Sequence, residues 1–244
     1  MGNRNRNGKS LNFFRLLMLL PLAAVLWACS PSEESAGGFG EEYYPIETGA
    51  FITYDVQEIN HRFPSGRHDT VHYLLRETVA DTFIDAAGGT SYKLVRETQD
   101  DNDSTWKIDS VWAVRRNGNS IVKTESNRPQ VKLVFPLKSG QVWNGNMLID
   151  SAATQEEYWE MKSLGKPLVI ANKSFPKTAI IEQRDENNCR LRKTGYEYFA
   201  QGIGLIYKEQ VSLQYKETEV LCDGPLIIEI GTERRYYYKE HGKN

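Results

Sequence analysis

The sequence predicts a mainly β protein in which antiparallel strands, joined as hairpins, form a curved sheet or an open barrel. Apolar and polar residues alternate through most of the chain after residue 42, which is the period of a strand with one buried face. Turn sequences rich in glycine, asparagine and aspartate separate the alternating stretches. Helical periodicity is nearly absent, so hairpins of antiparallel strands are the expected architecture.

The clearest strand is predicted at residues 203–215. Six of its seven odd-numbered positions are apolar, Glu209 being the exception, and Lys208 stands on the opposite face. The same alternation recurs in residues 71–79, 106–114, 131–135 and 226–230. Only residues 151–164, SAATQEEYWEMKSL, suit a helix, and their YWEMK portion also suits a strand.

The first 28 residues have the three parts of an export signal. Four basic residues precede an apolar run of 12 residues at positions 16–27, and Ala28 is a small residue at a cleavage site. The run is too short to cross a bilayer as a helix, so a cleaved secretory signal is expected at residues 1–28.

Leu26, Trp27, Ala28 and Cys29 resemble the lipobox, the cleavage signal of bacterial lipoproteins. The resemblance implies cleavage after Ala28, a diacylglyceryl thioether on Cys29, and acylation of the new amino terminus, for example with palmitate. Several acyl chains hold a protein firmly at a membrane. The expected location is therefore the bacterial outer membrane, on its periplasmic or cell-surface side. The alternative is an ordinary cleaved signal with an incidental cysteine.

The remaining chain divides into three parts. Residues 29–42 are small, polar, acidic and glycine-rich, which predicts a flexible tether. Their acidic residues also resemble the surface-export signals of lipoproteins from the Bacteroidetes group, with a plain linker as the alternative. Residues 43–238 are expected to form a single β-rich domain, and residues 239–244 a tail.

Two segments of this domain echo each other. YPIETGAFI (44–52) and FPLKSGQVW (135–143) share an aromatic-Pro-aliphatic start, with a glycine five residues after the aromatic residue. Glycine permits a tight turn before an apolar strand begins. The repetition suggests related halves at residues 43–134 and 135–238.

The segments YYPIETG, FPLKSGQVWNGN and YEYFAQGIGLIYKE resemble the markers of a broad group of secreted, β-rich bacterial lipoproteins. Its members carry Phe-Pro-Leu-x-x-Gly-x-x-Trp and, later, an aromatic-Ala-Pro-Gly-Val-Gly-Leu run, in which Gln201 here replaces the usual proline. The resemblance covers about residues 43–215 and implies a β fold in the cell envelope. The members are mostly uncharacterised, so no catalytic residue carries over.

The net charge argues against one class of partner, and the cysteines predict a disulfide. Without residues 1–28, which hold four of the 30 basic residues, the chain has 26 basic and 32 acidic residues and a formal net charge of −6. Phosphate binding needs a basic face, so nucleic acid is not an expected partner. Cys189 and Cys222 remain after lipidation, and an oxidising compartment favours a disulfide between them over two buried thiols.

No catalytic residue, metal site or cofactor is predicted. His68 and His72 are four residues apart, which on a strand is about 13 Å and too far for one zinc ion. The stretch DDNDST begins like a calcium loop but lacks the required glycine and final glutamate. The serine-glycine pairs lack the strand-turn-helix context of a hydrolase nucleophile.

The tryptophans are the strongest candidates for ligand contact. Trp106 and Trp112 fall on the apolar face of their strand and are expected in the core. Trp143 and Trp159 could contact a ligand through their rings, but core packing is the favoured interpretation of the tryptophans.

These observations predict a membrane-anchored, non-enzymatic binding or structural module of the cell envelope, which holds a glycan, a lipid or an envelope protein. The alternative is a hydrolase of envelope polysaccharide that uses two carboxylates far apart in sequence. Such a pair lies about 5 to 9.5 Å apart across a cleft.

Lipidation is testable directly. Metabolic labelling with a palmitate analogue is expected to label the wild-type chain and not the Cys29→Ala variant, because the variant lacks the sulfur that receives the lipid. Equal labelling of both chains would contradict the assignment of Cys29.

Overall fold

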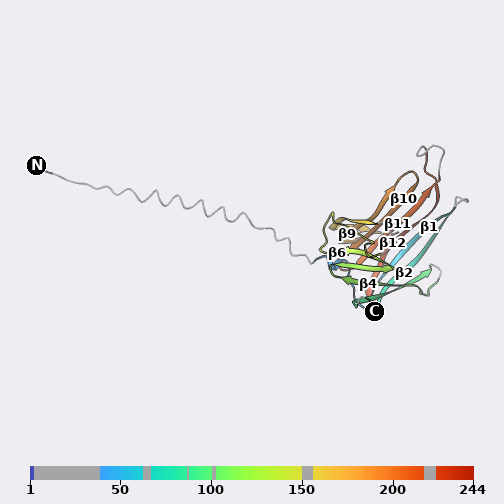
Figure 1. The fold of residues 1–244 in the computed structure, drawn as a ribbon, viewed down its shortest axis with the longest axis horizontal. Coiled ribbons are helices and arrows are strands. Elements are labelled where there is room, and N and C mark those ends of the chain that lie inside the picture. Colours follow the sequence, from blue (N-terminus) through green and yellow to red (C-terminus); the bar gives the residue numbers. More distant parts are fainter. Residues whose placement is uncertain (3–38, 63–66, 87, 101–102, 150–155, 217–223) are drawn as a thin grey trace. The chain divides into compact units, whose positions relative to one another are not determined.

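The computed structural model describes residues 1–2, 39–62, 67–86, 88–100, 103–149, 156–216 and 224–244. Within these ranges, twelve antiparallel β-strands form one sheet that curls into a nearly closed, barrel-like unit with almost no helix (Figure 1). This confirms the predicted mainly β fold. No helix in the described part of the chain is long and apolar enough to cross a membrane.

In the described residues, one short helix is followed by twelve strands. A short 3₁₀-helix, η1 (Glu41–Tyr43), precedes the strands. The strands are β1 (Ala50–Arg62), β2 (Arg67–Ile84), β3 (Thr90–Asp100), β4 (Lys107–Asn117), β5 (Ser120–Glu125), β6 (Arg128–Val134), β7 (Val142–Asn144), β8 (Tyr158–Ile170), β9 (Lys173–Asn187), β10 (Leu191–Ala200), β11 (Gly204–Tyr215) and β12 (Ile228–Lys243).

Pairing between the first and last strands joins the two parts of the sheet. The strand order is β6-β5-β4-β3-β2-β1-β12-β11-β10-β9-β8-β7, so each strand except β6 and β7 pairs with two neighbours. β1 and β12 lie in the middle, where Tyr54 is opposite Tyr238. Figure 1 shows the long strands β2, β1, β12, β11 and β10 side by side. The free edges of the sheet are therefore β6 and β7.

Hydrogen bonds outside the strand ladders connect these two edges. The Val131 backbone N–H donates to the Gly145 carbonyl oxygen at 2.8 Å. The Trp143 indole N–H donates to the Val131 carbonyl oxygen, also at 2.8 Å. The Gln141 side-chain amide donates to the Val134 carbonyl oxygen at 3.1 Å. These bonds satisfy polar groups that an open edge would leave to solvent.

Trp143 and Trp159 pack at this junction as part of the largest hydrophobic cluster. Their rings meet edge to face with centroids 6.4 Å apart, and only 7% and 2% of the two residues is exposed. A Cβ atom on Gly145 would lie 2.2 Å from the Trp159 ring, so the close approach of backbone and indole requires glycine there.

Both ends of the predicted domain need correction. β12 continues to Lys243, and the Asn244 N–H donates to the Gly49 carbonyl oxygen at 2.9 Å, so residues 239–243 are strand and not a tail. Residues 39–42, assigned to the tether, pack on the sheet. The Leu137 N–H donates to the Phe39 carbonyl oxygen at 3.2 Å, and the Gly202 N–H donates to that of Glu42 at 2.8 Å.

The ambiguous helical segment contains a strand. β8 begins at Tyr158, so the YWEMK portion pairs as a strand with β7 and β9. Residues 151–155 of the same segment lie outside the described residues.

The predicted strand at 203–215 exists as β11, but its faces change along its length. The β10–β11 register shifts at Tyr198 and Phe199, where Leu205 is opposite Phe199 and Tyr207 is opposite Tyr198. The extra residue of such a bulge moves the following side chains to the other face. Lys208 is consequently buried, with 6% exposed, and not on the solvent face.

Candidate binding pocket

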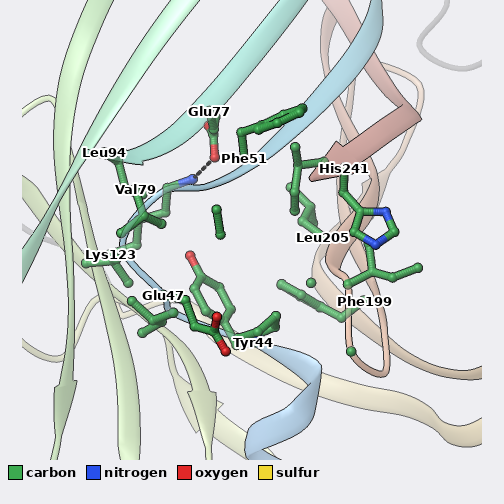
Figure 2. A pocket seen from close by; sticks show the side chains of 18 of the residues that line it. Tyr44, Glu47, Phe51, Glu77, Val79, Leu94, Lys123, Phe199, Leu205 and His241 are labelled. Atoms are coloured by element: carbon green, nitrogen blue, oxygen red, sulfur yellow. Dashed lines mark hydrogen bonds and ion pairs between the residues drawn. The ribbon is translucent and has the colours of Figure 1, made fainter. Parts of the chain in front are cut away.

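An apolar pocket of about 370 Å³ opens into the unit beside the start of β1 and the end of β12. Most of its walls come from hydrophobic side chains of β1 to β4, β10, β11 and the segment before β1. The wall residues include Tyr44, Ile46, Phe51, Ile52, Val79, Leu94, Val114, Phe199 and Leu205 (Figure 2). A volume of this size lies within the range of small-molecule sites.

The first echo segment and the later marker supply much of this lining. Tyr44 and Ile46 belong to the first echo segment, and Phe199, Gly202 and Leu205 belong to the later marker. In the first echo, Gly49 has φ 88° immediately before β1; in the second, Gly140 has φ 77° two residues before β7. Both echo segments therefore turn before a strand, but of the two only the first lines the pocket.

Exposed lining residues mark the mouth of the pocket. Among them, Glu47, His241 and Lys243 are exposed to solvent. The Lys243 ammonium group donates to the Glu47 carboxylate at 3.0 Å, and both side chains are more than half exposed. An ion pair of this kind adds little stability, so it does not hold the mouth shut.

At its deep end the pocket meets charged groups. Seven side chains form what we term the interior network: Glu77, Arg96, Lys123, Glu125, Lys132, Glu197 and Lys208. They come from β2, β3, β5 and β6 on one side and from β10 and β11 on the other. No member has more than 16% of its side chain exposed.

Each carboxylate of the network contacts at least two cations. Glu77 accepts hydrogen bonds from Arg96 at 3.0 Å and Lys123 at 2.9 Å. Glu197 accepts one from Lys132 at 2.9 Å and lies 3.4 Å from the Lys208 ammonium nitrogen.

The third carboxylate links both sides of the network. Glu125 lies 3.0 Å from the Lys132 ammonium nitrogen and 3.6 Å from that of Lys208. Pairing on this scale is what permits so much charge inside a small domain, because an unpaired buried charge is very costly.

The pairing is reflected in the direction of the pKa shifts. Burial raises the pKa of Glu125, but the neighbouring ammonium groups, Lys132 first, outweigh it and hold that pKa well below its ordinary value. Burial also raises the pKa of Glu197, but the Lys132 and Lys208 ammonium groups outweigh burial. The net shift of the Glu197 pKa is therefore downward. Burial lowers the pKa of Lys132, but the Glu125 and Glu197 carboxylates together outweigh burial, so the net shift is upward. These groups stay ionised at neutral pH.

The network separates two cavities. Glu77, Lys123, Lys132 and Glu197 line the apolar pocket. The other three members, Arg96, Glu125 and Lys208, line a polar hollow of about 640 Å³ together with Arg128, Arg234 and Tyr236. The interior therefore changes from apolar to charged to polar along its length.

The predicted ligand contacts lie elsewhere. Trp143 and Trp159 are core residues at the β6–β7 junction, and neither lines the apolar pocket, although Trp159 borders a smaller polar hollow. Their place in the core agrees with the favoured core interpretation, and contact of either residue with a ligand stays a prediction. The physical reason is that both indoles fill the gap where the sheet edges approach.

Three predicted residues lie outside the described part of the chain, namely Ala28, Cys29 and Cys222. Cys189, at the turn before β10, is disulfide-bonded. Its pairing with Cys222 stays a prediction.

The histidines form ion-pair and ring contacts on strands. His61 Nε2 lies 3.0 Å from the Glu233 carboxylate, and its ring centroid lies 6.0 Å from that of His68. Among the described residues there is no group of three or more histidine, cysteine, aspartate or glutamate side chains that could hold a metal ion.

The interior network was missed because a lone lysine in an alternating strand is normally a solvent-facing residue. One signal was available in the sequence. Lys132 stands between Val131 and Leu133 in the run VKLVF, and all three are at most 2% exposed. A charged residue inside a short apolar run indicates a strand that is buried on both faces.

Comparison with known proteins finds similarity only in structure. No protein-family model matches the chain, and no curated protein is detectably similar in sequence. A Bacteroides fragilis protein provisionally described as exported, with a YmcC-like fold, is 12% identical with a TM-score of 0.41, over 81% of this chain and 98% of its own. A provisionally described lipoprotein of Parabacteroides distasonis is 10% identical with a TM-score of 0.32, over 82% of this chain and 98% of its own.

Stability is expected to depend on pH through the interior network. The lowered carboxylate pKa values stabilise the fold above about pH 4.3, and this contribution is lost as the pH falls through the folded-state values. The raised pKa values of Lys132 and Lys208 stabilise it below about pH 10.4, and this contribution is lost as the pH rises through the folded-state values. Thermal unfolding followed by circular dichroism should show midpoints that fall in both acid and alkali.

Two variants distinguish the effect of the interior network on the unfolding midpoint from the effect of a surface carboxylate. Glu125→Gln should lower the midpoint at neutral pH and weaken its dependence on acid, since one titrating carboxylate is gone. Glu160→Gln, which removes a carboxylate with 39% of its side chain exposed, should keep the wild-type profile. A wild-type midpoint that rises on acidification would contradict the role of the network.

Proposed function

We propose that this protein is a lipid-anchored protein of the bacterial outer membrane that binds an apolar ligand in its interior pocket without catalysing a reaction. The observation that carries the proposal is the pocket itself, whose walls are apolar and whose mouth is open to solvent. The lipobox-like residues around Cys29 support the anchor, and they would hold the pocket beside the membrane.

The apolar walls favour a lipid-like ligand over a glycan. Phe51, Leu94 and Phe199 offer surfaces that gain free energy by excluding water. Sugar recognition needs several polar contacts around the ligand, whereas the charged groups of this pocket lie at its deep end and its mouth, with apolar walls between them. An apolar molecule or an alkyl chain is therefore the ligand class that fits the walls.

The charged groups support binding over hydrolysis. A glycosidase needs one carboxylic acid whose raised pKa keeps it protonated as the general acid. Glu77, Glu125 and Glu197 are the carboxylates of the network, and the pKa of each is lowered by neighbouring cations despite burial. Hydrolysis by distant carboxylates therefore remains the less favoured proposal.

The proposal is tested by a neutral apolar probe. N-phenylnaphthylamine fluoresces strongly in apolar surroundings, and it is titrated into the full chain in nanodiscs, with empty nanodiscs subtracted. Saturable binding is expected. Ile46→Trp, which adds volume at a half-buried wall position, should weaken binding by about tenfold or more.

The matched control is Ile230→Trp, at an exposed position of β12 that does not line the pocket. It should bind the probe as the wild type does. The proposal fails if the wild type binds no probe beyond the nanodisc background, or if Ile46→Trp, folded by circular dichroism, binds it with unchanged affinity.

A further inference from the structure

The deep end of the pocket holds hydrogen-bond donors that the protein itself does not use. The Tyr44 ring reaches into the pocket with its hydroxyl pointing toward the interior (Figure 2). Among the described residues, this hydroxyl has no hydrogen-bond partner. Burial, followed by the Glu77 charge, raises the pKa of Tyr44 well above its ordinary value, so the hydroxyl keeps its proton and remains a donor.

Lys123 supplies further donor capacity at the same end of the pocket. Its ammonium group can donate three hydrogen bonds. Within the described residues it donates one, to Glu77 at 2.9 Å, and its other contacts are with Glu125 at 3.9 Å and the Trp112 ring. By contrast, the Lys132 ammonium group is fully occupied by Gln130, Glu197 and Glu125. Tyr44 and Lys123 are therefore the groups that could meet a ligand.

The interior network contains one more cation than carboxylates, which leaves its ammonium groups able to accept a further negative partner. Four cations face three carboxylates, and every carboxylate already contacts two or more cations. The fourth carboxylate near the network, Asp109, pairs with Arg96 but has 44% of its side chain exposed. One positive charge of the network is thus balanced only by Asp109, at the rim of the polar hollow and not in the pocket.

The positions of the charged and apolar groups decide how an amphiphile would lie in the pocket. A ligand that entered tail first would press its apolar end against ionised groups and remove water from them at a high cost. A ligand that enters head first places its charge beside Tyr44 and Lys123 and its chain along Val79, Leu94 and Phe199. The head-first orientation satisfies both ends.

We propose that the pocket selects a single-chain acidic amphiphile of the fatty-acid type, whose carboxylate accepts hydrogen bonds from Tyr44 and Lys123 while its alkyl chain lies along the apolar walls. This inference rests on the proposed function and specifies its ligand. It differs from that proposal in one respect, because it requires the site to distinguish a carboxylate from a neutral head group of the same chain length.

The experiment compares dodecanoic acid with dodecanol as competitors for N-phenylnaphthylamine on the full chain in nanodiscs at neutral pH. Empty nanodiscs are titrated in parallel to subtract partition into lipid. The acid is expected to displace the probe at a concentration at least about tenfold lower than the alcohol. Hydrogen bonds to charged groups are stronger than those to neutral groups, and this ratio corresponds to about 1.4 kcal/mol.

Tyr44→Phe keeps the ring and removes the hydroxyl, so it should weaken displacement by the acid about tenfold and displacement by the alcohol by less. Its control is Tyr158→Phe, which removes an exposed hydroxyl bonded to Glu156 and should change neither.

The outcomes separate the two proposals. Equal displacement by acid and alcohol would overturn the inference, and so would a Tyr44→Phe variant that keeps the wild-type preference for the acid. In both cases probe binding by the wild type leaves the proposed function standing. Absence of probe binding to the wild type would overturn the proposed function itself.

Discussion

Lys132 and Glu197 lie on strands that have seven other strands between them in the sheet, yet their charged groups are 2.9 Å apart. Contact between such distant strands is possible only if the sheet curls until its two parts face each other. The hydrogen bonds between Val131, Trp143 and Gly145 bring the edges together at one side of the unit. The ion pair connects β6 to β10 across the interior, where water is largely excluded. This pair belongs to the interior network, and the apolar pocket and the polar hollow lie on its two sides.

The interior network also explains why the unit has cavities. Hydrophobic side chains would fill the middle of a small barrel completely, as they do in many small β-barrels. Long, paired side chains from β2, β3, β5, β6, β10 and β11 occupy part of it here. The apolar pocket lies on one side of them, and the polar hollow on the other. Removing one partner of a pair would leave a buried charge without compensation, so substitutions in the interior network should lower the stability of the fold strongly.

The strand content was predictable because alternation reports directly on local structure. The alternating residues 203–215 became β11, and the Asn117-Gly118 dipeptide lies at the turn between β4 and β5. The orientation of individual side chains was not predictable, because a single bulge beside Tyr198 moves Lys208 from the outer to the inner face. The pocket was partly visible in sequence, since Tyr44 belongs to the first echo segment and Phe199 to the later marker. Apart from Lys132 within its apolar run, the network was not visible, because its members come from six strands that only the closed sheet brings together.

The central claim is that Lys132 and Glu197 stabilise the curled sheet as a pair, and a double-mutant cycle tests it most directly. Chemical denaturation is measured for Lys132→Met, Glu197→Gln and the double variant. Each single change should lower the free energy of unfolding by about 3 to 5 kcal/mol, since it leaves a buried partner with fewer opposite charges. The double variant should lose clearly less than the sum, with a coupling energy of about 1.5 kcal/mol or more. Losses that simply add would show that the two charges do not act together, and would contradict the account.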